Sequence, residues 1–490
     1  MSLNVMAPHG IFKNTWERPG SAWVGTWLWD NAFHSKIWSL SNLDYAAYVL
    51  ESHMKFQDKE NPNDEYNYGR IPHSIEGNKV NSWTQPPLMA WAFWELFKKN
   101  GSIDMLARYF SDLFAYHLWL NFNRDLNKDG LYSWLHGFES GIDNAPRYDS
   151  ISPLECNAVD FSSCVSVQLR SLIHMATVLK DIPTRDGLLE RKKELDDWIN
   201  EDLWDEETAF FYDKAFAGKH EGEFIGPKMI SGWYPLFAGI VPRHRLGRYL
   251  SHLTDSSEFW TPFPVATVAR DEESFDEEMN MWRGPTWINT NYIIIKGLKG
   301  YGFRALPGEL AYLTVKHLFD VYNEKEIYYE YYSSLGNNDG IETFSRKKEK
   351  NGPRPYFGWT CLVANILVEE MLGIEVQHDA ILLVPSVPDA FINVLQEGVV
   401  KGTLPKVNGW NQGNIEFTID FKPGNIINYR FNLDMPMDIH VVDFDTKESI
   451  FTGDYLNMID IDIENNKDVV SILSKPDGLV SKEEFQVEDG

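Results

Sequence analysis

The apolar residues of this 490-residue chain recur with the period of an α-helix from about residue 25 to residue 375. In the stretch 43–58, for example, Ala46, Leu50 and Met54 fall on one helical face. Helices are predicted at 43–58, 87–99, 103–124, 158–181, 185–203, 287–299, 305–323 and 359–371, with helical segments near 228–253 and another helix starting near Asp30. Roughly a dozen helices in pairs predict a mainly α protein folded as an (α/α)6 barrel. An open α-solenoid is the alternative, which the lack of a fixed-period repeat disfavours.

The pattern changes past residue 375 to short apolar runs with a period near two. Strands are predicted at 381–385, 414–421, 426–431, 439–442 and 458–462, and glycines lie between several of them. These features predict a C-terminal antiparallel β-sandwich. We therefore expect a helical barrel over residues 1–375 and a β-sandwich domain over 376–490, with a loose acidic tail from about residue 476.

The charge of the chain argues against two classes of partner. It carries 72 acidic and 45 basic residues, a formal net charge of −27. Nucleic acids and anionic membrane surfaces bind basic patches, so neither is expected as a partner. No apolar run approaches the ~20 residues that cross a bilayer, and no signal pattern is recognised at the N-terminus. The three cysteines form no CxxC pair and no disulfide framework, so we expect a cytoplasmic protein.

Aromatic residues are unusually frequent. The chain has 18 Trp, 22 Tyr and 29 Phe, 14% of its residues, and many lie beside Asp, Glu, Asn or Gln. Sugar pockets combine flat apolar faces with hydrogen-bonding groups in this way. A large core also uses many aromatics, so the local clusters must decide between the two interpretations.

The stretch 139–149 contains three carboxylates and one guanidinium. Gly141 and Pro146 disfavour a long helix, so a shaped loop between two helices is predicted. Loops of this kind commonly carry functional groups. We interpret Asp143 as a catalytic acid, and Gly141 and Arg147 as substrate contacts beside it.

A second carboxylate, Glu330, lies among four tyrosines in the stretch 327–336. Partly apolar surroundings with hydroxyl donors tune the acidity of a carboxylate. Tyr332 is the candidate donor that orients it. A surface acid among interface aromatics would give the same pattern, but the pair Asp143 and Glu330 matches the two carboxyl groups that glycosidic bond cleavage needs.

Further clusters supply candidate sugar contacts. They are Trp27, Trp29, Asp30 and Phe33 in one stretch, Gln85 in a second, Trp282, Arg283 and Trp287 in a third, and Trp359 in a fourth. Three of these stretches have a structural alternative: Asp30 as a helix N-cap, Arg283 in an ion pair, and the turn at 357–360 as a helix cap.

These motifs, in this order, resemble glycoside hydrolase family 63. The matching segments are Trp-x-Trp-Asp-x-x-Phe-His, Gln-Pro-Pro, Glu-Ser-Gly-x-Asp-Asn-x-Pro-Arg, Trp-Arg-Gly-Pro-x-Trp, Glu-x-Tyr-x-x-x-Gly and Phe-Gly-Trp, across residues 20–372. The family includes processing α-glucosidases and mannosylglycerate and glucosylglycerate hydrolases, and is related to the trehalases. The resemblance implies an (α/α)6 barrel and an inverting mechanism, with Asp143 as acid and Glu330 as base. It also implies that sugar contacts come from Trp29, Asp30, Gln85, Trp282, Arg283, Trp287 and Trp359. The larger members have an N-terminal β-domain, whereas here the β-region follows the barrel.

One stretch has the opening spacing of a calcium loop, at Asp125, Asn127 and Asp129. Its twelfth position is His136 in place of the bidentate Glu of an EF-hand, and Asx turns use the same residues. We favour the turn interpretation. No metal and no cofactor is expected, because no HExxH pattern and no glycine-rich phosphate loop is found.

The sequence therefore predicts an inverting glycoside hydrolase that cleaves an α-linked gluco- or manno-configured small glycoside. The expected partner is a small neutral or weakly anionic saccharide. Arg147 and Arg283 are candidates for binding a glycerate carboxylate, although both lie in motifs shared by the whole family. A non-catalytic carbohydrate-binding protein, and a sugar epimerase or polysaccharide lyase on the same toroid, are the alternatives.

Overall fold

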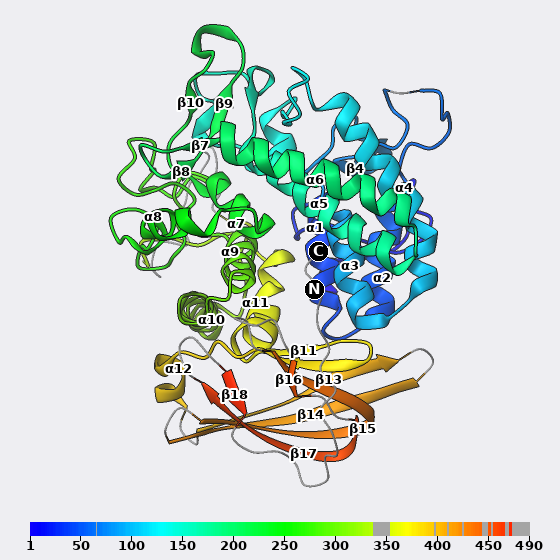
Figure 1. The fold of residues 1–490 in the computed structure, drawn as a ribbon, viewed down its shortest axis with the longest axis vertical. Coiled ribbons are helices and arrows are strands. Elements are labelled where there is room, and N and C mark those ends of the chain that lie inside the picture. Colours follow the sequence, from blue (N-terminus) through cyan, green and yellow to red (C-terminus); the bar gives the residue numbers. More distant parts are fainter. Residues whose placement is uncertain are drawn as a thin grey trace.

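The structure is a computed structural model that describes residues 1–64, 66–336, 353–395, 398–408, 411–423, 426–442, 449–451, 454–465 and 470–472. Figure 1 shows a helical part, coloured blue to yellow, with a β-sheet, coloured yellow to red, along one end. One continuous apolar core extends from Leu28 in the helical part to Ile463 in the sheet. The predicted acidic tail lies outside the described residues.

Among the residues that the structure describes, six helices line the inside of the helical part. They are α1 (Leu28–Trp38), α3 (Met89–Asn100), α5 (Val159–Val178), α7 (Tyr234–Ala238), α9 (Ile288–Gly300) and α11 (Leu362–Asn365). Each contacts the next, and α11 contacts α1, so these helices form a closed ring. Helices α5 and α9 are buried over most of their length, as helices packed on every side must be.

Outer helices cover this ring. They are α2 (Leu43–Met54), α4 (Ile103–Asn123), α6 (Ile182–Asp202), α8 (Arg243–Thr254) and α10 (Ala305–Lys325). Helices α2, α4 and α6 begin at a cap: the side chains of Asn42, Ser102 and Asp181 each accept a hydrogen bond from the backbone N–H three residues later. The prediction of a mainly α chain is confirmed. The helical segments predicted near 228–253 are α7 and α8, which Gly239, at φ +74°, and Pro242 separate.

Short strands lie in the loops between the helices. Strands β3 (Gly25–Trp27), β4 (Ser74–Glu76) and β5 (Lys79–Val80) form one small antiparallel sheet. Others pair as β1 (Val5–Met6) with β2 (Trp16–Glu17), β7 (Trp204–Asp205) with β8 (Phe210–Phe211), and β9 (Asp213–Ala215) with β6 (Cys156–Asn157) and β10 (Phe224–Ile225). Strand β3 leads directly into α1, so the β3–β4–β5 sheet fixes the entry to that helix.

The C-terminal strands form one hydrogen-bonded sheet in the described residues. Its path is β11 (Ile374–Val376), β12 (Ala380–Leu383), β15 (Ile426–Val442), β14 (Asn411–Lys422) and β13 (Val399–Asn408), and β16 (Ser449–Phe451), β17 (Asp454–Asn465) and β18 (Val470–Ile472) complete it. The strands predicted at 426–431 and 439–442 are one strand, β15.

The antiparallel prediction is wrong for one pair, because β12 and β15 run parallel with Ile381 opposite Ile439. The chain between them includes α12 (Asp389–Val394), β13 and β14, a connection long enough to bring β15 back in the same direction. The sheet is therefore mixed.

Specific polar contacts attach the sheet to the helices. The Tyr429 hydroxyl donates to the Leu372 carbonyl at 2.7 Å, and Arg304 Nη1 donates to the Pro385 carbonyl at 2.9 Å. Lys98 Nζ on α3 lies 3.4 Å from Glu375 Oε1 on β11. Within the described residues, no helix is long and apolar enough to cross a membrane.

Candidate active site

A pocket of ≈ 310 Å³ lies at the ends of the inner helices and is lined by residues far apart in the sequence. Trp27 ends β3, Trp29 and Asp30 lie at the start of α1, and Gln85 precedes α3. Asp143 and Gly141 come from the loop before α5, Trp282 and Trp287 precede α9, and Glu330 and Trp359 precede α11. The predicted residues thus come together because each belongs to a segment that enters an inner helix.

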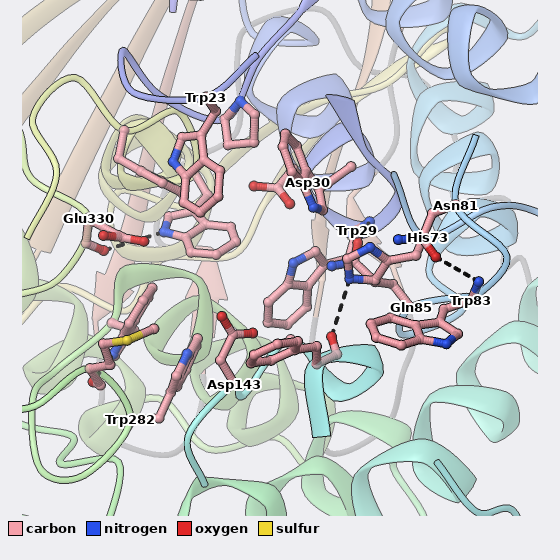
Figure 2. A pocket seen from close by; sticks show the side chains of 18 of the residues that line it. Trp23, Trp29, Asp30, His73, Asn81, Trp83, Gln85, Asp143, Trp282 and Glu330 are labelled. Atoms are coloured by element: carbon pink, nitrogen blue, oxygen red, sulfur yellow. Dashed lines mark hydrogen bonds between the residues drawn. The ribbon is translucent and has the colours of Figure 1, made fainter. Parts of the chain in front are cut away.

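Four carboxylates line this pocket, and three of them, Asp30, Asp143 and Glu330, come from motifs that the sequence analysis singled out. Figure 2 shows Asp143 and Glu330 with Asp30 beside them, among tryptophan side chains. Asp30 is only 3% exposed, and burial raises its pKa well above the usual range. The negative charges of Glu330 and Asp143 raise it further. Asp30 Oδ1 is buried and has no hydrogen-bond partner among the described residues.

The loop that carries Asp143 is fixed on both sides. Before it, Gly141 adopts φ +72° and lies so close to Trp29 that an added Cβ would be 2.4 Å from Cζ2 of the indole. After it, Asn144 Oδ1 accepts from the Trp282 N–H at 2.9 Å, and Asn144 Nδ2 donates to the Asn280 carbonyl at 2.9 Å. Asp143 itself is half-buried.

Glu330 is 3% exposed and lies at a bend between the bridge residues Tyr329 and Tyr332. Its N–H donates to the Arg354 carbonyl at 2.9 Å, and the Arg354 N–H donates back to Glu330 Oε2 at 3.3 Å. Trp359 Nε1 donates to the Glu330 carbonyl at 3.4 Å. These hydrogen bonds fix the backbone at Glu330, whose carboxylate lines the pocket.

Stacked aromatic rings form the wall near Glu330. Trp282 and Trp287 are parallel, with centroids 3.8 Å apart, and Tyr331 stacks on Trp287 at 4.9 Å. Trp29 meets Trp359 edge-on at 5.3 Å. Such rings offer flat apolar faces to the C–H surface of a sugar.

Four predicted contacts lie outside the pocket lining. Phe33 is fully buried and packs against Trp29 and Trp91. The hydroxyl of Tyr332 accepts from the Tyr329 N–H at 2.9 Å instead of orienting Glu330.

The other two are arginines that are already paired. Arg147, 2% exposed, contacts Asp160 at 2.6 Å and Asp213 at 3.1 Å. Arg283 pairs with Asp149, and its Nε donates to the Asn144 carbonyl at 2.9 Å. Arg283 therefore positions the loop that carries Asp143. This is the structural ion pair that the sequence analysis gave as the alternative to a sugar contact.

The sequence interpretation missed several residues that line the pocket: Pro19, Trp23, His73, Glu76, Asn81, Trp83, Phe138, Met281 and Phe357. His73, Glu76, Asn81 and Trp83 belong to β4, β5 and the segments that flank them. Strands of two or three residues give no periodic signal, so only the position of Trp83 just before the Gln-Pro-Pro motif pointed to this region.

The candidate calcium loop is a set of turns. Asp129 Oδ1 accepts from the Leu131 N–H at 2.9 Å, and Asp129 Oδ2 accepts from Asn127 and Asn157 amide groups, each at 2.6 Å. No group of three or more His, Cys, Asp or Glu side chains suited to a metal ion is found in the part of the chain that the structure describes.

Sequence comparison then decides the family. The profile described as "Mannosylglycerate hydrolase MGH1-like glycoside hydrolase domain" matches residues 24–360. The chain belongs to this family. This glycoside hydrolase is 26% identical over 407 residues to the mannosylglycerate hydrolase of Thermus thermophilus, an alignment that covers 65% of the chain and 91% of that enzyme. The mannosyl-oligosaccharide glucosidase of Saccharomyces cerevisiae is 24% identical over 265 residues, 49% of the chain but only 30% of the glucosidase.

Solved structures show the same fold for this glycoside hydrolase. The glycoside hydrolase family 63 mannosylglycerate hydrolase from Thermus thermophilus in complex with glucose superposes with a TM-score of 0.60 at 22% identity, covering 75% of this chain and 97% of that one. Neutral trehalase from Saccharomyces cerevisiae gives a TM-score of 0.56 at 13% identity, covering 75% and 76%. The predicted resemblance to family 63 is confirmed.

Proposed function

We propose that the protein is an inverting glycoside hydrolase that cleaves an α-linked gluco- or manno-configured small glycoside. The observation that carries this proposal is the convergence of Asp30, Asp143 and Glu330 on one pocket walled by tryptophans. The closed ring of inner helices supports an (α/α)6 barrel as the scaffold that brings them together.

Asp143 acts as the general acid. It donates a proton to the glycosidic oxygen as the bond from that oxygen to the anomeric carbon breaks. Three nearby carboxyl groups cannot all be ionised without mutual repulsion, so the cluster favours a proton on one of them near neutral pH. Asp30 lies beside both other acids and contributes to this electrostatic repulsion. It also accepts hydrogen bonds from sugar hydroxyls.

Glu330 acts as the general base. It accepts a proton from a water molecule that attacks the anomeric carbon from the side opposite the leaving oxygen, which inverts the configuration. Such a mechanism requires the two carboxyl groups to be ~6.5–9.5 Å apart, so that the water fits between Glu330 and the sugar. The sugar ring then binds at the buried end of the pocket, against Trp359 and the stacked pair Trp282 and Trp287.

A panel of α-linked disaccharides, glucosylglycerate and mannosylglycerate tests this function, with proton NMR of the first product formed from whichever substrate is cleaved. We expect the product to appear with the opposite anomeric configuration. Asp143→Asn and Glu330→Gln should each reduce kcat by ~100-fold or more, since general acid–base catalysis contributes ~100- to 10,000-fold. Glu207→Gln removes an exposed carboxylate elsewhere and serves as the control. Retained configuration, or full activity in both variants, would refute the assignment.

The same variants separate the alternatives. A non-catalytic carbohydrate-binding protein would turn over no substrate, and its sugar affinity would be insensitive to Asp143→Asn. An epimerase or a lyase would release products with altered stereochemistry or a new double bond in place of a reducing sugar, which the same NMR spectra distinguish.

A further inference from the structure

The open end of the pocket is built by residues that the proposed reaction has not yet used. His73, Glu76, Asn81 and Trp83, here called the mouth cluster, come from β4, β5 and the segments on either side. Glu76 is exposed, and Asn81 and Trp83 are half-buried, whereas Trp282 and Trp287 at the other end are each 1% exposed. The pocket therefore runs from a closed end near Glu330 to an open end at the mouth cluster.

The mouth cluster lies on the side of the acid away from the base. Figure 2 shows Asp143 between Glu330 on one side and His73, Asn81 and Trp83 on the other. In an inverting reaction the acid protonates the leaving oxygen and the base activates water on the opposite face of the sugar. The leaving group therefore lies against the mouth cluster.

The mouth cluster has the chemistry of a site for a neutral polyhydroxylated group. Trp83 presents an indole whose plane is held by a parallel stack on His136, with centroids 4.7 Å apart. The Asn81 side chain is fixed by accepting from the Trp83 N–H at 2.8 Å. Glu76 Oε1 accepts from the Ser74 hydroxyl at 2.7 Å. One aromatic ring with amide and carboxylate groups beside it suits a sugar ring with hydroxyls.

The electrostatics of the pocket oppose a negatively charged leaving group. Asp30, Glu76, Asp143 and Glu330 line it, and the described lining residues include no lysine or arginine. Burial lowers the pKa of His73 to about 4, so this imidazole is neutral near pH 7.

The two arginines that the sequence offered for a glycerate carboxylate are occupied elsewhere. Arg147 is buried between Asp160 and Asp213, and Arg283 pairs with Asp149. The Thermus thermophilus family 63 enzyme has been solved with D-glycerate, an anion. The described residues that line the pocket offer such an anion four carboxylates and no lysine or arginine.

We propose that the mouth cluster is a leaving-group subsite for a neutral sugar or polyol, with Trp83 stacking on it and Glu76 excluding anionic leaving groups. This inference rests on the proposed function and narrows its substrate class. It makes a neutral α-linked disaccharide a better substrate than a glycosylglycerate.

A matched pair of substrates tests the charge preference in the unmodified protein. Glucosylglycerate and glucosylglycerol, each α-linked through the 2-hydroxyl, differ only by a carboxylate in place of a hydroxymethyl group, and the mannosyl pair differs in the same way. We expect kcat/KM to be about fivefold or more higher for the neutral member of whichever pair is cleaved, since one like-charge contact near a protein surface has at least that effect. Equal rates, or faster cleavage of the glycerate, would overturn the inference.

Variants at Glu76 assign the preference to this site. Glu76→Lys reverses the charge at the mouth and should lower the neutral-to-anionic ratio of kcat/KM by about tenfold. Glu207→Lys changes the net charge equally at an exposed position outside the pocket and should leave the ratio unchanged. A ratio that moves equally in both variants, or in neither, would contradict the role of Glu76.

Variants at Trp83 test the stacking. Trp83→Ala should raise KM for an α-linked disaccharide by about 3- to 10-fold, the effect of losing one aromatic contact, with a smaller change in kcat. Trp83→Phe keeps a ring and should recover most of the affinity. Equal KM values in the unmodified protein and Trp83→Ala would remove Trp83 from the subsite.

A 4-nitrophenyl α-glucoside and α-mannoside separate the two proposals. If aryl cleavage depends on Glu330 but glycosylglycerates are cleaved faster than glucosylglycerol, the hydrolase assignment stands and the neutral subsite is refuted. If no α-glycoside is cleaved, both proposals fall together.

Discussion

The approach of Gly141 to Trp29 determines where Asp143 sits. Gly141→Ala would place a Cβ 2.4 Å from the indole at φ +72°, so the loop must shift. Because a displacement of ~1 Å can cost on the order of 100-fold in rate, we expect kcat to fall by at least ~10-fold. Gly187→Ala is the matched control, since Gly187 lies in α6 with open space around its added Cβ. Steady-state kinetics of the two variants check this, and an unimpaired Gly141→Ala enzyme would contradict it.

Glu17 makes stability depend on pH. Burial raises the pKa of Glu17 from 4.5 to about 8, although Trp38 Nε1 donates to both of its oxygens at 3.1 Å. The folded state therefore holds this proton more tightly than the unfolded state. The contribution of Glu17 to the free energy of unfolding is complete below about pH 4.5. It is lost as the pH rises through about 8, and the free energy of unfolding falls by up to ~1.4 kcal/mol per pH unit. The neighbouring His34, with a pKa lowered to about 3 by burial, stays neutral in this window.

Glu17→Gln keeps a hydrogen-bond acceptor for Trp38 but cannot ionise. We expect its Tm to fall less than that of the unmodified protein between pH 5 and pH 8, measured by thermal unfolding at constant ionic strength. The exposed Glu207→Gln should follow the unmodified protein. Parallel curves for Glu17→Gln and the unmodified protein would show that Glu17 does not carry this dependence.

The candidate catalytic residues were predictable where a motif contained them. Asp30, Asp143 and Glu330 each stand in a segment with a recognisable residue order, and the fold brings these segments to one pocket. Arg147 stands in such a segment too, but its partners Asp160 and Asp213 are 13 and 66 positions away. Sequence alone gives no measure of that pairing, because it depends on how α5 and β9 pack against the loop.

At the scale of elements, a buried cation holds the ring of helices together. Lys36 Nζ on α1 lies 3.1 Å from Glu95 Oε2 on α3 and 3.1 Å from Glu369 Oε2 in the segment that continues α11. Lys36→Met would leave two buried carboxylates with less neutralising positive charge. We therefore expect the free energy of unfolding to fall by about 3–5 kcal/mol. Chemical denaturation measures this. Lys193→Met, which removes an exposed pair with Asp197, should change the stability little, and an equal effect of the two variants would contradict the role of Lys36.

Helix positions followed from the sequence far better than strand positions. The predicted helices at 103–124 and 287–299 match α4 and α9 to within one residue at each end, because Ser102 caps α4 and a run of apolar residues follows Pro285 into α9. Strands β4 and β5 were missed because they are too short for alternation to show. Strand β13 was missed because Lys401, Gly402 and Pro405 interrupt its apolar pattern.

At the scale of the whole molecule, the helical part and the sheet share one core. The apolar cluster is continuous between them, and the Tyr429 hydroxyl bonds the backbone of Leu372 where the helices end. We therefore expect the full chain to unfold in one cooperative calorimetric transition. A chain that ends at residue 372 would lose β11 to β18 and expose the apolar surface that they cover. It should bind a hydrophobic dye, lose near-ultraviolet circular dichroism and lose hydrolysis. A chain that ends at residue 472 keeps every described strand and is the control, expected to behave as the full chain. Two resolved transitions in the full chain, together with an active chain ending at residue 372, would show that the helical part folds independently of the sheet.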